Sequence, residues 1–126
     1  MREIVALAVA GAAGTLGRWG LSSLSARLLG DRFPFGTLVV NVVGCLLLGL
    51  LMEAVLVTEI VPHPWRMPLT VGFLGAFTTF SAFGYETLRY LERGQWWPAL
   101  ANVGANVVLG LAVVWIGFMV GRVALS

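Results

Sequence analysis

The chain has 126 residues, of which 59% are hydrophobic and 11% are charged, and its mean hydropathy is +0.91. This composition supplies too little polar surface to coat a soluble globule of that size, so a soluble domain is excluded. The net charge of +2 comes without any run of basic residues, which argues against a nucleic-acid-binding segment. We therefore predict an integral membrane protein.

Four apolar segments are each long enough to cross a bilayer, which takes about 20 helical residues. Short connections containing glycine, proline and charged residues separate them. We expect an all-α membrane protein with a single four-helix transmembrane domain over residues 1–126. The predicted spans are 4–28, 36–57, 67–91 and 96–123.

The first segment begins like a secretory signal, because Arg2 precedes an apolar run and residues 8–10 read Ala-Val-Ala. The apolar stretch continues well past that point, which favours a membrane helix instead. Glycines recur in it at steps of three and predict a ridge for close helix contact. They are Gly11, Gly14, Gly17 and Gly20.

Asparagines inside the spans are costly in hydrocarbon and are therefore functional candidates. The amide of Asn41, in the second segment, offers two N–H donors to an anion or to a neighbouring helix. Asn102 and Asn106 share a face of the fourth segment and are candidates for a donor-rich pore wall. A hydrogen bond between helices is the alternative for each asparagine, but together with Thr79 and Ser81 they favour a polar track.

The third segment carries the most informative stretch, residues 72–86, which reads GFLGAFTTFSAFGYE. Gly75 and the β-branched Thr78 and Thr79 are poor helix residues. They predict an interruption at which backbone groups are released to bind something. Phe80 and Phe83 follow on neighbouring helix faces, where the positive rims of their rings can meet an anion.

Three of the charged residues within the spans are functional or interfacial candidates. Arg18 either attracts anions into a vestibule or extends its guanidinium to the membrane surface. Glu86 is a candidate for a gate or for the rim of a water-filled mouth, and its alternative is an ion pair with Arg89. Glu53 is expected at the membrane interface.

Arginines are divided almost evenly between the two ends of the spans. Four crossings place Arg2, Arg66 and Arg122 on one side, and on the other Arg27, Arg32, Arg89 and Arg93. Because orientation depends on an imbalance of cationic residues, insertion in both directions is expected. A four-helix chain fills its own centre, so a solute path is expected between subunits. The GxxxG pattern at 117–121 fits internal packing and a dimer contact equally well.

The sequence contains no pattern typical of an active site or of a cluster of metal ligands. We predict that the chain is not an enzyme. No nucleophile, base and orienting group recur at usable spacing, and no phosphate-binding loop is present. Cys45 is the lone cysteine, in an apolar segment, and His63 has no companion ligands.

At this point the motifs resemble those of a known family. Residues 36–44 (GTLVVNVVG) and 72–83 (GFLGAFTTFSAF) look like the motifs of the CrcB/Fluc fluoride channels, and residues 14–19 (GTLGRW) resemble the first-helix motif. Length and four-span layout match as well. The chain departs from the family pattern at Ala76 and Ala82, where relatives often have glycine and threonine.

The resemblance implies an antiparallel, dual-topology homodimer with two fluoride pores. Carried over by position, Phe80 and Phe83 are the rings that contact fluoride, Asn41 is the amide donor, and Thr79 and Ser81 supply hydroxyls. It also implies that Arg18 and Glu86 lie in the vestibule and pore. Gly75 and Thr78 are expected to contribute backbone carbonyls to a structural Na⁺ at the dimer interface.

The expected function is passive export of cytoplasmic fluoride through the inner membrane of a prokaryote, which confers fluoride resistance. One alternative is a small multidrug-type, proton-coupled exporter, but such exporters need a deep carboxylate in the first helix, and none follows Glu3. Another is a non-transporting membrane assembly subunit, which would leave Phe80, Phe83 and Asn41 without a role.

Overall fold

A computed structural model describes all of residues 1–126, and every regular element in it is helical. The first two spans are single helices, α1 (Arg2–Leu29) and α2 (Phe35–Val57). The third is assembled from α3 (His63–Met67), the π-helical η1 (Pro68–Leu74), α4 (Gly75–Phe77) and α5 (Phe80–Glu92). The fourth is assembled from α6 (Trp96–Gly104), the π-helical η2 (Ala105–Leu109) and α7 (Gly110–Leu125).

Four helical stretches are long and apolar enough to cross a membrane, which confirms the predicted all-helical, four-span layout. Each contains the span expected from the sequence and extends it by a few residues. The third and fourth exceed the minimum length for a crossing, so they can tilt across the bilayer. The stretches are Arg2–Leu29, Phe35–Val57, His63–Glu92 and Trp96–Leu125.

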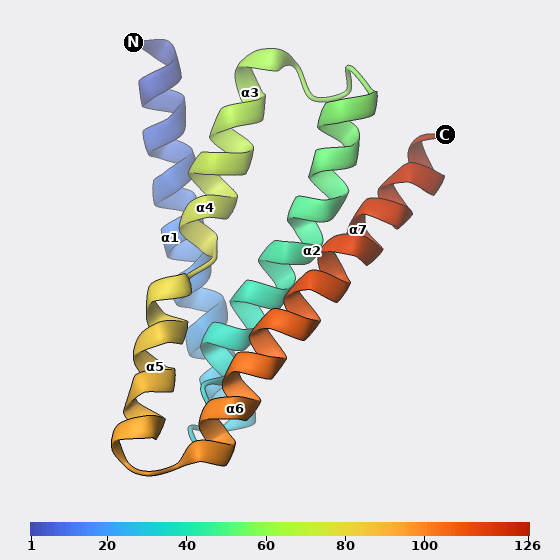
Figure 1. Ribbon diagram of the computed structural model, residues 1–126. Helices are drawn as coiled ribbons and strands as arrows, with labels where there is room; N and C mark the ends of the chain where they lie inside the picture. Colours follow the sequence, from blue (N-terminus) through green and yellow to red (C-terminus); the bar gives the residue numbers. More distant parts are fainter.

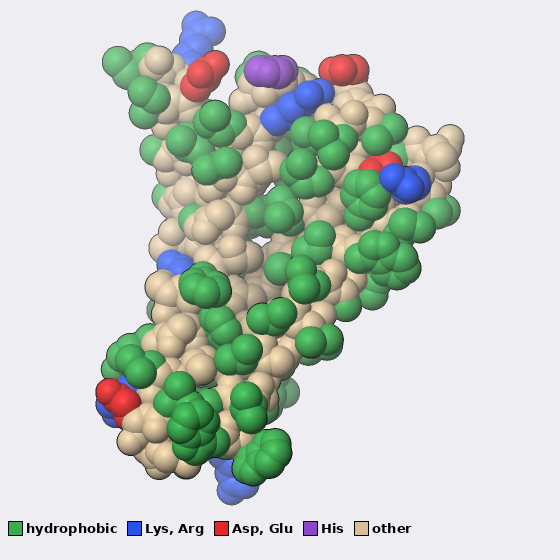
Figure 2. All heavy atoms as spheres, in the orientation of Figure 1, with side chains coloured by type: hydrophobic (Ala, Val, Ile, Leu, Met, Phe, Trp, Pro, Cys, Tyr) green, Lys and Arg blue, Asp and Glu red, His purple; other side chains and the backbone are tan.

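Both chain termini lie at one end of the molecule, together with the turn between α2 and α3 (Figure 1). The turns between α1 and α2 and between α5 and α6 lie at the other end. On the face shown in Figure 2, charged side chains gather mainly at these two ends, and hydrophobic side chains cover much of the length between them. This distribution is the one that a lipid bilayer requires of a protein that crosses it.

Helices α2 and α7 share the most extensive contact, which has glycines on both sides. A Cβ atom added to Gly49 would collide with the Val114 carbonyl, and one added to Gly117 would collide with the Leu46 carbonyl. Gly121 likewise lies against α2, at Glu53. The GxxxG pattern at 117–121 therefore serves packing within the chain.

Helix α1 packs along η1 and α4, on the side of the molecule away from α7 (Figure 1). A Cβ added to Gly14 would collide with the Phe73 carbonyl, and Gly17 faces the ring of Phe77. Gly11 also lies near this contact, whereas nothing lies within 4 Å of a Cβ at Gly20. The predicted glycine ridge is thus confirmed except at Gly20, beyond the reach of the third span.

Candidate functional site

The third span is interrupted between α4 and α5. Thr78 (φ −86°, ψ 158°) and Thr79 (φ −147°, ψ 113°) are both extended, and a new helix starts at Phe80. The predicted break in this helix is confirmed at the pair of threonines. The β-branched side chains of that pair favour extended backbone over helix.

Side chains take over the hydrogen bonds that an unbroken helix would make across the break. The Thr79 N–H donates to Asn41 Oδ1 (2.8 Å), where a continuous helix would direct it to the Gly75 carbonyl. The Ala82 N–H donates to the Thr79 hydroxyl (3.2 Å), so Thr79 acts as the N-cap of α5. In a continuous helix that N–H would bond to the Thr78 carbonyl. The carbonyls of Gly75 and Thr78 therefore lose their usual helical partners.

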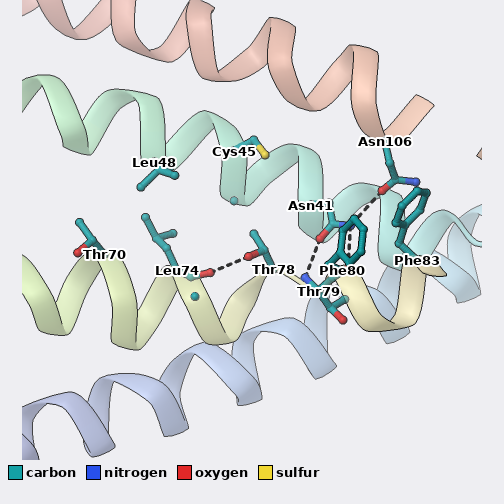
Figure 3. Close-up of a pocket in the computed structure, with 12 residues that line it drawn as sticks. Asn41, Cys45, Leu48, Thr70, Leu74, Thr78, Thr79, Phe80, Phe83 and Asn106 are labelled. Carbon is teal, nitrogen blue, oxygen red and sulfur yellow. Dashed lines mark hydrogen bonds between the residues drawn. The ribbon is translucent and has the colours of Figure 1, made fainter. Parts of the chain in front are cut away.

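Asn41 holds the extended residue from both sides. Its Oδ1 accepts from Thr79 N–H, and its Nδ2 donates to the Thr79 carbonyl (3.1 Å) and to Asn106 Oδ1 (3.0 Å), as drawn in part in Figure 3. Both amide hydrogens of Asn41 are thus donated to acceptors within the chain. The expectation that they serve an anion remains a prediction.

A cavity of about 320 Å³ lies beside the break, between α2, the third span and η2 (Figure 3). Phe80 and Phe83 line it with ring centroids 5.3 Å apart and planes tilted by 60°. Phe83 is 9% exposed, whereas Phe80 is 82% exposed. Polar groups from three spans reach the same cavity: Asn41, Thr70, Thr78, Thr79 and Asn106.

The two asparagines of the fourth span differ in position. Asn106 lines the cavity, and its Nδ2 donates to both the carbonyl (2.9 Å) and Oδ1 (3.0 Å) of Asn102. Asn102 is fully buried outside the cavity lining and donates to the Thr87 hydroxyl (3.0 Å). Of the two expected pore-wall residues, only Asn106 is at the cavity.

Glu86 joins α5 to α2. Its Oε1 accepts a 2.6 Å hydrogen bond from the Thr37 hydroxyl, and its Oε2 is buried without a partner. The alternative ion pair with Arg89 is absent, because Arg89 pairs with Glu92 at 3.1 Å. Sequence reasoning did not single out Thr37, although it lies one helical turn before Asn41 on the same face.

A second cavity, of about 360 Å³, opens where α5 ends and includes Glu86. Three arginines line it: Arg32, Arg89 and Arg93. Arg18, the predicted vestibule residue, is half-buried on α1 and lines neither cavity. The structure thus brings Glu86, but not Arg18, to a mouth lined by these three arginines and by Asp31.

The remaining predicted positions are less closely tied to the cavity. Ser81 is exposed and lies within hydrogen-bonding distance of the Thr79 hydroxyl (3.3 Å). Cys45 lines the cavity as a free thiol. Glu53 is only 2% exposed, and its expected position at the membrane interface stays a prediction. Its side chain lies in the α2–α7 contact against Gly121, which has no side chain to occupy that space. Arg122 pairs with it there at 3.5 Å.

A family model described as "CrcB-like protein, Camphor Resistance (CrcB)" matches residues 5–118 of this sequence. The chain belongs to the CrcB-like family. The resemblance inferred from the motifs is thereby confirmed. Together with the four spans, membership makes this CrcB-like chain a multi-pass membrane protein.

Curated relatives cover nearly the whole CrcB-like chain. A protein from Geobacter metallireducens is 49% identical over 97% of this chain and 98% of its own length. One from Dehalococcoides mccartyi is 48% identical over 96% and 93%, and one from Solibacter usitatus 46% over 92% and 95%. All three are named "Fluoride-specific ion channel FluC".

Proposed function

We propose that this chain is a fluoride-selective ion channel that lets cytoplasmic fluoride leave the cell and so confers resistance to it. The observation that carries the proposal is the broken third helix, which brings Phe80, Phe83 and Thr79 to the same cavity as Asn41. The relatives' printed name describes the same activity, which is transport and not enzymatic turnover. Because the named relatives are bacterial, the chain is assigned to the inner membrane of a prokaryote.

Fluoride is small and strongly hydrated, so its path must replace water with donors and positive ring edges without a deep trap. Phe80 and Phe83 supply the ring edges, and the hydroxyls of Thr79 and Ser81 supply donors. Asn41 Nδ2 can exchange its neutral acceptor, Asn106 Oδ1, for the passing anion, since hydrogen bonds to charged acceptors are the stronger. Flow is passive and follows the fluoride gradient.

The working unit that we propose is an antiparallel, dual-topology homodimer with two pores. Phe80 is 82% exposed on a single copy, so its side of the cavity needs a second surface to enclose it. The two ends of the molecule carry similar numbers of arginines, which allows both orientations in the membrane. Glu86 and the three arginines at the second cavity then form one mouth of each path.

A structural Na⁺ at the dimer interface fits the residues present. The chain has no cluster of histidine, cysteine or carboxylate ligands, but the Gly75 and Thr78 carbonyls have lost their usual helical partners. Two copies facing each other would offer four such oxygens, the ligand type that hard cations prefer. Gly75 is exposed, so its carbonyl is within reach of a partner. Bound there, the ion would neutralise carbonyl dipoles and hold the breaks together.

Anion efflux from liposomes that contain the purified chain tests the proposal. With a potassium ionophore to balance charge, a fluoride electrode should record rapid release, while chloride release should stay near that of protein-free liposomes. Equal rates for the two anions, or no release of either, would contradict the proposed function. Replacing sodium by N-methylglucamine throughout preparation should lower the fluoride rate; an unchanged rate would remove the sodium site alone.

A further inference from the structure

We propose that Asn102 is a positioning residue, which aims the amide of Asn41 at the pore without contacting the ion. It acts through hydrogen bonds that we call the amide relay, formed by Asn41, Asn106, Asn102 and Thr87. The inference rests on the proposed function, because it assigns to these side chains the orientation of a fluoride donor. Asn102 is fully buried and lines neither the cavity beside the break nor the arginine-lined mouth.

The relay runs in one direction from donor to acceptor. Asn41 Nδ2 donates to Asn106 Oδ1 (3.0 Å), Asn106 Nδ2 to Asn102 Oδ1 (3.0 Å), and Asn102 Nδ2 to the Thr87 hydroxyl (3.0 Å). The Thr87 hydroxyl donates to the Phe83 carbonyl (2.8 Å). The relay therefore begins at the proposed amide donor and ends on the backbone of a proposed pore ring.

Direction matters because a carboxamide can rotate by a half turn and exchange its donor for its acceptor. Asn102 prevents this in Asn106, because it presents two acceptors, its carbonyl (2.9 Å) and Oδ1, to the same Nδ2 group. Asn106 must then turn Oδ1 toward Asn41, which favours the N–H side of Asn41 for that direction and adds to the hold of the Thr79 backbone on the same amide. An Asn106 turned the other way would set its own NH₂ against the NH₂ of Asn41.

Thr87 fixes the direction of the hydrogen bonds at the other end of the amide relay. Its hydroxyl hydrogen is donated to the Phe83 carbonyl one turn earlier, so its lone pairs remain to accept from Asn102 Nδ2. A hydroxyl has only one hydrogen, and this commitment makes Thr87 an acceptor toward the relay. Removal of the hydroxyl would leave the buried Asn102 amide without that partner and free it to rotate.

Thr87→Val and Thr87→Ser test the relay, because valine keeps the shape of threonine without the hydroxyl and serine keeps the hydroxyl. Two quantities are measured: fluoride efflux from liposomes, and the ¹⁵N–¹H signal of the Asn41 side-chain amide in nanodiscs. Ser25→Ala is the matched control, since the buried Ser25, like the half-buried Thr87, donates to a carbonyl one turn earlier (2.7 Å), but no side chain donates to it.

We expect Thr87→Val to lower efflux on the order of tenfold, the scale of one lost buried hydrogen bond. It should also move the Asn41 signal, and Thr87→Ser should restore both. Unchanged efflux, or lowered efflux with an unmoved Asn41 signal, would overturn the proposal. If Thr87→Val does not fold, Thr87→Ala is judged by the same two measurements. Absence of fluoride efflux from the unaltered chain would reject the proposed function, while the Asn41 signal would still decide whether the relay orients this amide.

Discussion

The two phenylalanines beside the break have different surroundings, although they stand only three residues apart. Phe83 is 9% exposed and belongs to the wall that one copy builds for itself, whereas Phe80 is 82% exposed. Their tilted rings, with centroids 5.3 Å apart, present edges at different angles to the same cavity. In the proposed channel, Phe83 is thus already buried in the single copy, and Phe80 becomes enclosed only when two copies associate.

Replacing either ring by isoleucine should abolish fluoride efflux, because an aliphatic side chain has no positive rim to meet an anion. A buried hydrophobic exchange of this kind usually lowers stability by less than about 1.5 kcal/mol, so Phe83→Ile should still fold. Liposome efflux measures the first effect and elution volume in detergent the second. Phe35→Ile is the matched control, because Phe35 does not line the cavity beside the break and its ring instead contacts Phe33. Efflux that survives in Phe80→Ile or Phe83→Ile would remove that ring from the mechanism.

Some residues of the site could be predicted from the sequence, and others could not. Asn41, Thr79, Phe80 and Phe83 were expected to act together, and the structure places them on one cavity. That Asn41 donates to the Thr79 carbonyl could not be foreseen, because this contact depends on the extended backbone that Thr79 adopts at the break. Thr87 was missed for a different reason. Threonine in a helix commonly bonds to a carbonyl one turn back, so its sequence position carries no signal of a second partner.

At the scale of elements, the long α2–α7 contact holds together two of the spans that line the cavity beside the break. Glycines let the two backbones approach closely, and this closeness brings Asn106 on η2 to Asn41 on α2. The break and the GxxxG contact were both visible in the sequence as departures from helix-forming composition. The π-helical turns η1 and η2 were not, because widened turns depend on the packing of neighbouring spans more than on local propensity.

Gly117→Ala should destabilise the chain, because the new methyl group would collide with the Leu46 carbonyl. Overpacking of a close contact typically costs about 1–3 kcal/mol. Gly20→Ala offers a control within a helix, since nothing lies within 4 Å of the added Cβ, and alanine favours helix over glycine. Thermal unfolding in one detergent compares the two. Equal midpoints for Gly117→Ala and the unaltered chain would contradict this account of the contact.

At the scale of the whole molecule, the ends of the bundle are similar in charge and different in shape. The end with both termini spreads apart, while the other end gathers α5 and α6 closely (Figure 1). Length, hydropathy and arginine placement were enough to predict four spans and both termini at one end. The pairing of spans was not predictable from them, because it depends on which glycine faces meet.

Both ends of the chain should be found on both sides of the membrane. In a Cys45→Ala background, a cysteine introduced at Ser126 should react with a membrane-impermeant maleimide in roughly half of the molecules in intact cells. The remainder should react only after permeabilisation. Labelling of all molecules from one side would exclude dual topology. Arg2→Gln combined with Arg66→Gln should bias the labelling, since it leaves one arginine at that end against four at the other.

The incomplete wall around Phe80 has a consequence for how a cell controls this pore. If the proposed homodimer is the working unit, a newly inserted copy would conduct nothing by itself, since its cavity would stay open along one flank until another copy covered it. Conduction would then begin only when two copies that diffuse in the bilayer meet and associate. At low expression, the conductance of a cell would rise with the square of the number of copies per area, so a small change in synthesis would have a disproportionate effect.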